Sequence, residues 1–216
     1  MTRVRTLGSF VLHMLLAVSV LSLTGCEAFK AMAYYSSPKS EKMPAEFSRL
    51  AGKDTVVYVW APMETLWDYP KFRLDVASYV SAYIRANVDD VHVVDPLQVE
   101  SWIEKSSRSD RDPVEVGRAF GARMVVHVSV FNFSTRDPGM AHFYRGRMNG
   151  AVAVYDMTLP DQEPDRFALK DVAVVVPEEG AVGFNNASPE QVRQATYEAF
   201  TVAVGRKFHD WERMLD

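Results

Sequence analysis

Three segments of this chain carry the same helix-start signature, and their positions limit how the rest can fold. Each has an aspartate or serine cap, a proline directly after it, and a glutamate or glutamine three residues after the cap: Asp95-Pro96-Leu97-Gln98, Asp112-Pro113-Val114-Glu115 and Ser188-Pro189-Glu190-Gln191. The cap accepts a hydrogen bond from a first-turn N–H group, and proline is tolerated there because its missing N–H has no partner to lose. The sequence therefore predicts helices that begin at residues 96, 113 and 189.

Apolar runs typical of strands and helices fill the spaces around these helix starts. Residues 55–60 and 91–94 are short β-branched runs that predict buried strands, and apolar residues at helical spacing between them predict a helix over 71–88. Three longer runs, over 124–133, 144–157 and 167–176, are joined by turn sequences rich in proline and aspartate.

The resulting element order is strand, helix, strand, two short helices, three antiparallel strands and a final helix. This order predicts an α/β (α+β) fold, with a single mixed β-sheet of about five strands and helices packed on it. We expect the final helix to run to the chain end, with Phe208 and Trp211 on its inner side.

The first 25 residues have the three-part pattern of an exported protein. Arg3 and Arg5 form a basic start, an apolar run extends from Phe10 to Leu23, and small residues stand before Cys26. The run is shorter than the roughly 20 apolar residues that a membrane-crossing helix needs. A cleaved signal peptide is therefore favoured over an uncleaved anchor.

The segment Leu23-Thr24-Gly25-Cys26 resembles the bacterial lipobox, whose cysteine receives a diacylglyceryl group before cleavage. Cys26 is the only cysteine, so it can form no disulfide within the chain, and an unmodified thiol is the alternative. The resemblance implies a lipid-anchored protein of the bacterial cell envelope. Glu27 follows the cysteine, whereas the best-known inner-membrane retention signal is an aspartate there, which favours the outer membrane.

We therefore divide the chain into a signal peptide (1–25), a lipidated cysteine with a flexible tether (26–53) and a periplasmic α/β domain (54–216). Residues 27–53 are mixed and mostly polar, without a sustained period. A flexible tether of this length would reach on the order of 25–30 Å on average. The domain should then stay near its membrane.

Charge and motif content exclude several classes of function. The chain has 24 Lys and Arg against 28 Asp and Glu, and it lacks the basic clusters that bind nucleic acid. We find no metal-ligand spacing, phosphate-binding loop or nucleophile motif, and therefore expect no metal, no cofactor and no enzymatic activity. His92, His127 and His209 fit sheet or surface positions. An envelope enzyme with an unfamiliar site is the alternative.

The element order, together with the segment Phe120-Gly121-Ala122-Arg123-Met124-Val125-Val126, resembles the domain of penicillin-binding-protein activator lipoproteins. The curli secretion lipoprotein and the amino-terminal domain of the Tol-system propeller protein are similar. Stretches such as Trp67-Asp68-Tyr69-Pro70 also resemble a group of uncharacterised bacterial lipoproteins. The scaffold relatives act through protein contacts, so the resemblance implies a module that binds an envelope protein or assists assembly. A structural homo-oligomer is a further alternative.

Two segments hold more surface chemistry than folding requires. The hairpin between residues 136 and 147 holds four basic side chains that suit carboxylate or phosphate binding: Arg136, His142, Arg145 and Arg147. Alternation along a strand would place both Arg145 and Arg147 on one sheet face, although a charged, soluble turn is the alternative. The loop after the first strand holds Trp67 and Tyr69, which are interface candidates or residues that cap the core.

Overall fold

A computed structural model describes residues 40–105, 112–136, 139, 142–159, 163–183 and 185–215. They form two compact units. Of the described residues, the smaller unit contains 40–42 and 212–215, where β1 (Ser40–Met43) pairs with β10 (Trp211–Met214) and Arg213 forms an ion pair with Glu41. The larger unit spans Met43–Trp211 and contains the main sheet. The signal peptide and Cys26 lie outside the described residues.

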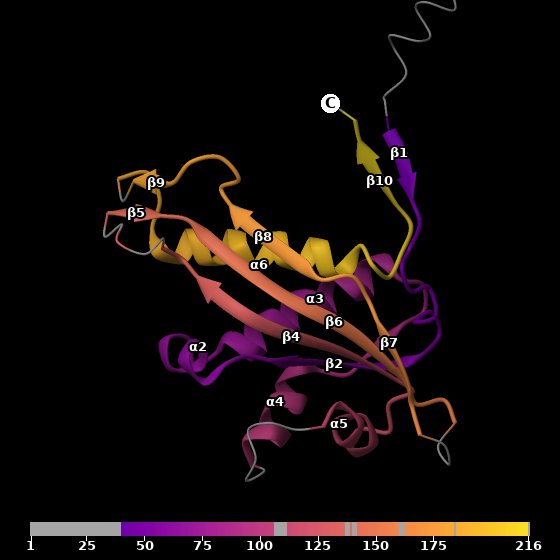
Figure 1. Ribbon diagram of the computed structural model, residues 1–216. Coiled ribbons are helices and arrows are strands. Elements are labelled where there is room, and N and C mark those ends of the chain that lie inside the picture. The colour runs from indigo at the N-terminus through magenta and orange to yellow at the C-terminus, as the bar shows by residue number, and fades with distance from the viewer. Residues whose placement is uncertain are drawn as a thin grey trace, which may run out of the picture. The chain divides into compact units, whose positions relative to one another are not determined.

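The main sheet of the larger unit is mixed, which confirms the predicted α/β class (Figure 1). Its strands are β2 (Asp54–Trp60), β3 (His92–Val93), β4 (Met124–Ser134), β6 (Gly146–Asp156), β7 (Asp165–Ala168) and β8 (Val172–Val176). The order is β3-β2-β4-β6-β7, and β8 also pairs with β6. The first three strands are parallel, whereas β6 runs antiparallel to β4, β7 and β8. The run predicted over 167–176 is thus divided between β7 and β8.

The larger unit also contains five helices within the described residues: α2 (Met63–Asp68), α3 (Phe72–Asn87), α4 (Pro96–Lys105), α5 (Pro113–Ala119) and α6 (Pro189–Gly205). The three proline-led helix starts are confirmed. The Asp95 and Asp112 carboxylates accept hydrogen bonds from first-turn N–H groups, and Ser188 forms a complete capping box with Gln191. No helix in the described part of the chain has the length and apolar character needed to cross a membrane.

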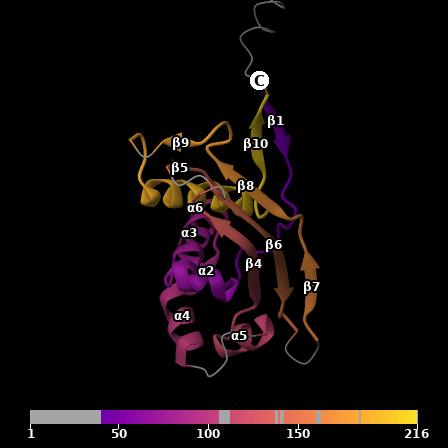
Figure 2. The ribbon, with the colours of Figure 1, turned by 60° about the vertical axis from the view of Figure 1, so that its left-hand side comes forward.

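Alternating side chains on β2 divide the core into two layers. Val57 and Val59 belong to the larger cluster, with residues of α3 and α6, whereas Val56 and Tyr58 belong to the second cluster, with residues of α4 and α5. Helices therefore cover both faces of the parallel half of the sheet (Figures 1 and 2). A separate two-stranded ribbon, β5 (Phe143–Tyr144) with β9 (Val182–Gly183), lies outside this sheet.

The final helix is shorter than predicted, and the placement of Trp211 on its inner side is wrong. α6 ends at Gly205, tight turns follow from Lys207 N to Val204 O and from Phe208 N to Gly205 O, and Trp211 begins β10. Phe208 is buried but lies beyond the helix. The spacing of these apolar residues also suits a helix, so periodicity could not reveal where the helix ends.

The packed unit begins before residue 54, because the segment predicted as a tether reaches the core. Leu50 is fully buried at 0% exposure and Phe47 is also buried, both in the larger apolar cluster. Polar residues separate these two side chains in the sequence, so they produce no period that would indicate an element. Residues 43–53 are therefore part of the folded unit.

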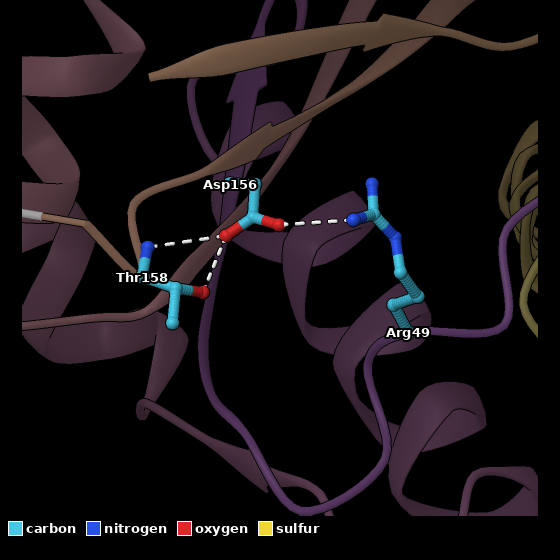
Figure 3. A network of polar contacts seen from close by, with 3 residues as sticks. All are labelled: Arg49, Asp156 and Thr158. Carbon is cyan, nitrogen blue, oxygen red and sulfur yellow. Dashed lines mark hydrogen bonds and ion pairs between the residues drawn. The ribbon is translucent and has the colours of Figure 1, made fainter. Parts of the chain in front are cut away.

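A polar network fixes this segment to β6 (Figure 3). Arg49 Nη1 lies 3.3 Å from Asp156 Oδ2, and the same carboxylate accepts hydrogen bonds from the backbone N–H and the hydroxyl of Thr158. The Arg49 guanidinium also lies 4.3 Å from the centroid of the Phe167 ring. Burial raises the pKa of Asp156, but the Thr158 hydrogen bonds and the Arg49 charge outweigh it, and the net pKa is lowered.

A second polar contact joins the segment to the end of α6. Lys207 Nζ donates to Glu46 Oε1 over 3.0 Å, and the backbone N–H of Lys170 donates to Glu46 Oε2 over 2.9 Å. Burial raises the pKa of Glu46, but these hydrogen bonds and the two lysine charges lower it by more. The net pKa therefore falls below its usual value.

Candidate functional site

One face of the antiparallel half of the sheet is exposed. α4 and α5 pack against β2 and the first part of β4 on this face, and side chains farther along β4, β6 and β8 are exposed there. Register places Asn132, Asn149 and Ala173 in one row across the three strands. A second row contains Ser134, Arg147 and Val175. No helix in the described part of the chain covers these rows.

These two rows form a groove of about 440 Å³. Its polar lining consists of Asn132, Ser134, Arg136, Arg147 and Asn149, and β8 supplies an apolar wall. A β-bulge between Val130 and Asn132 lies at one end of the groove and shifts the register of β4 against β6. Such bulges commonly redirect side chains near binding sites.

Two glycines allow β6 to pass close to its neighbours around the groove. A Cβ at Gly150 would lie 2.4 Å from the Ser129 carbonyl oxygen, beside the bulge. A Cβ at Gly146 would lie 1.8 Å from Thr196 Oγ1 on α6. The stretch between these glycines, which carries Arg147 and Asn149, is therefore held tightly against β4 on one side and α6 on the other.

The groove concentrates positive charge on an acidic chain. The formal net charge of the whole chain is −4, yet the described lining residues include Arg136 and Arg147 and no acid. Arg136 Nη2 donates to the Tyr144 hydroxyl over 3.4 Å, and its guanidinium lies 5.0 Å from the centroid of the Tyr144 ring. This contact orients one guanidinium in advance, which favours binding of carboxylates or phosphates.

The structure separates the residues that the sequence grouped in the hairpin. Arg136 and Arg147 meet at the groove, whereas Arg145 precedes β6 and binds the loop after β8, with Nη2 donating to the Glu178 carbonyl over 2.6 Å. His142 is exposed and does not line the groove. Asp137 and Pro138 of the predicted turn lie outside the described residues.

The two aromatic candidates of the loop after β2 have different environments. Trp67 is 76% exposed on α2, a short helix where the sequence predicts a loop. Tyr69 is half-buried, with its ring 4.9 Å from the Phe133 ring and its hydroxyl 3.2 Å from Thr135 Oγ1. Trp67 is thus available for a surface contact, and Tyr69 packs at the end of the core.

The other histidines that the structure describes belong to strands or pack against aromatic rings. His127 stacks on Tyr58 with ring centroids 5.1 Å apart, and His209 lies 3.3 Å from the Tyr83 hydroxyl through Nε2. His92 is exposed at the sheet edge. Among the residues that the structure describes, no three His, Cys, Asp or Glu side chains are grouped to hold a metal ion.

The site residues predicted from the sequence do not include the groove residues Asn132, Ser134 and Asn149. Their signal was present, because polar residues alternate with apolar ones near the ends of two strands that are otherwise apolar. Alternation indicates a solvated sheet face but not which strands are neighbours. The pairing of β8 with β6, which completes the groove, appears only in the structure.

The fold and the groove define an α/β domain whose sheet is covered on both faces in its parallel half and open on one face in its antiparallel half. No protein-family model and no curated protein matches the sequence. Among solved structures, the chain is similar to the PelC dodecamer from Paraburkholderia phytofirmans, with 13% identity and a TM-score of 0.46 over 80% of this chain and 99% of that one.

Two further solved structures are similar to this chain at a comparable level. The lipoprotein GNA1162 from Neisseria meningitidis is 12% identical, with a TM-score of 0.40 over 69% of this chain and 96% of that one. The hypothetical protein CT253 from Chlamydia trachomatis is 10% identical, with a TM-score of 0.40 over 70% of this chain and 95% of that one. Similarity at this level does not transfer a function, so the function must be argued from the site.

Proposed function

We propose that this chain is a lipid-anchored protein of the bacterial envelope whose domain binds an acidic segment of another envelope protein. The lipobox-like segment that ends at Cys26 supports the anchor, and the groove on the open sheet face carries the binding role. In this proposal the domain is a binding module and not an enzyme, and it takes no metal or cofactor.

The chemistry of the groove supports a peptide ligand. Asn132 and Asn149 can each donate and accept hydrogen bonds, which suits the alternating N–H and C=O groups of a main chain. Arg136 and Arg147 add two sites for carboxylates, and the valines of β8 provide apolar contact. An acidic peptide segment satisfies all three features together.

Site-specific photocrosslinking from position 149 tests this proposal in the full-length chain within intact envelopes. A photoreactive residue at Asn149 should give one discrete adduct, and Arg147→Glu should abolish it because the reversed charge repels an acidic partner. Arg166→Glu is the matched control, since it reverses an exposed charge on β7, outside the groove lining.

The proposal would be contradicted if both charge reversals abolished the adduct, or if the adduct persisted in both variants. An adduct at twice the mass of the chain would identify a second copy as the occupant and support the homo-oligomer instead. Because charge attraction is screened by salt, the yield of a genuine adduct should also fall when isolated envelopes are washed at high ionic strength.

A further inference from the structure

A second pocket lies apart from the groove, beyond the carboxyl ends of β2 and β4. These strands are parallel, so their ends share one edge of the sheet, where open α/β sheets commonly bind ligands. The pocket has a volume of about 300 Å³. Its lining includes two acids, Asp68 and Asp75, two basic residues, Lys71 and Arg193, and the aromatic residues Tyr69, Phe72 and Tyr197.

Two helices present the polar groups of this pocket. Phe72 and Asp75 are three residues apart near the start of α3, and Arg193 and Tyr197 are four apart near the start of α6, so each pair shares a helix face. α3 and α6 meet here, and the Phe72 and Tyr197 rings lie 5.5 Å apart in an edge contact.

Opposite charges lie close together in this pocket without pairing. Asp75 and Arg193 are both half-buried, and no hydrogen bond or ion pair joins their side chains to each other or to any described residue. Arg73, two positions before Asp75, contrasts with this, because its Nη2 lies 2.6 Å from Glu100 Oε1. Burial raises the pKa of the Asp75 carboxyl, although the nearby charges of Arg193 and Lys71 oppose that effect.

The Tyr197 hydroxyl adds a buried polar group without a partner. Tyr197 is 3% exposed, and its hydroxyl has no hydrogen-bond partner among the described residues. Burial raises the pKa of this hydroxyl far above its ordinary value, so it remains protonated and can donate. Buried polar groups are normally satisfied, so a ligand in the pocket that reached this hydroxyl would complete its hydrogen bonding.

We infer that this pocket binds a free α-amino acid with an apolar side chain. The Arg193 guanidinium binds the carboxylate, the Asp75 carboxylate binds the ammonium group, and the half-buried Tyr69 ring contacts the side chain. The Tyr197 hydroxyl donates to the ligand carboxylate. A simple anion would meet repulsion from Asp75, and a simple cation would meet repulsion from Arg193, so the pair selects a zwitterion.

Calorimetric titration of the full-length chain in detergent tests this inference. The ligands are phenylalanine and leucine, each as L and D enantiomers, with N-acetylphenylalanine and phenylalanine amide as analogues that lack one charge. At least one zwitterion should bind with a Kd below about 1 mM, and both analogues should bind at least tenfold more weakly.

Single substitutions of pocket residues test whether the ligand binds in this pocket. Arg193→Gln and Asp75→Asn should each weaken binding at least tenfold, and Tyr197→Phe should weaken it severalfold while it preserves the core packing. Asp171→Asn, an exposed change outside the pocket lining, is the control and should leave the affinity unchanged. If a variant fails to fold, the comparison of zwitterion and analogues on the unmodified chain still decides.

No binding of any zwitterion at millimolar concentration would overturn the inference, and so would equal binding of N-acetylphenylalanine or phenylalanine amide. The inference does not depend on the peptide groove, because no variant here changes a residue that lines it. Crosslinking from position 149 should therefore persist in Arg193→Gln, and failure of one proposal leaves the other standing.

Discussion

Lys207 is a buried charged side chain, and its environment makes its contribution to stability measurable. Only 5% of this residue is exposed, and its ammonium group lies 3.0 Å from Glu46 Oε1. A buried charge that loses its partner keeps the cost of desolvation without the attraction that offset it. Glu46 therefore contributes more to the stability of the folded state than a carboxylate in an exposed ion pair.

We expect Glu46→Ala to lower the free energy of unfolding by roughly 1.5–3 kcal/mol, the usual range for a hydrogen bond to a charged group. Urea unfolding followed by circular dichroism measures the change. Glu41→Ala is the matched control, because the Glu41 and Arg213 side chains are about half exposed and such pairs contribute about 0–1 kcal/mol. Equal losses of unfolding free energy in the two variants would contradict a special role of the buried Lys207 in stability.

Asp156 should make stability depend on pH in the acid range. Its pKa in the folded chain is below the ordinary value of 3.8, so the folded state favours the carboxylate. The stability that this group contributes is present above its unfolded pKa and is lost as the pH falls through the folded pKa. Glu46, whose pKa is also lowered, has the same sign of dependence.

Asp156→Asn should reduce the free energy of unfolding by about 0.5–1 kcal/mol at neutral pH, because the exposed Arg49 side chain makes this a partly screened pair. The difference from the unmodified chain should shrink as the pH falls through the folded pKa of Asp156 and vanish below it, since both chains then carry a neutral group. Urea unfolding at a series of pH values measures this. A difference that persists unchanged at low pH would rule out a charge effect.

At the scale of elements, the segment 43–53 behaves as part of the domain although it contains no helix and its only regular residue is the end of β1. Leu50 and Phe47 fill the core, and the backbone N–H of Phe47 donates to the Lys207 carbonyl over 2.9 Å. The segment joins the start of the packed unit to the end of α6, which is more than 150 residues away in sequence.

Leu50→Ala should therefore cost about 2–5 kcal/mol, the range for a fully buried leucine. Ser48→Ala, an exposed change in the same segment, should stay within about 0.5 kcal/mol. A chain that begins at residue 54 should be less stable than Leu50→Ala, because it loses both apolar side chains and both polar contacts. Thermal unfolding of the three chains would show this order, and a stable chain from residue 54 would show that the segment is dispensable.

At the scale of the whole molecule, the proposed lipid anchor predicts that the chain is held at a membrane. Cys26→Ser should abolish incorporation of a clickable fatty acid and release the chain from membranes, because this thiol is the proposed attachment point for the lipid. The melting temperature should not change, since no disulfide is lost. Fluorescent detection of the label after cell fractionation measures both effects. Equal labelling of the variant would show that the lipobox resemblance is misleading.

The sequence by itself determined the fold class, the order of the main elements and the starts of the three proline-led helices. Caps such as Ser188 with Gln191 act over a few residues, and the apolar periods of β2 and α3 are also local, so both can be read before the chain is folded. The third strand-like run is predicted in the same way. Its division into β7 and β8 is not, because the two strands pair with different parts of β6.

The tertiary structure alone decided the end of α6, the burial of Leu50, the groove and the second pocket. Each depends on residues distant in sequence, such as Asn132 with Asn149 and Ala173, or Asp75 with Arg193. Local propensity determines which segments form strands and helices, but strand order and helix packing determine which side chains meet. A site assembled from residues that are distant in sequence has no local signal. The sequence therefore indicated its residues only where their chemistry was already unusual, as at Arg136 and Arg147.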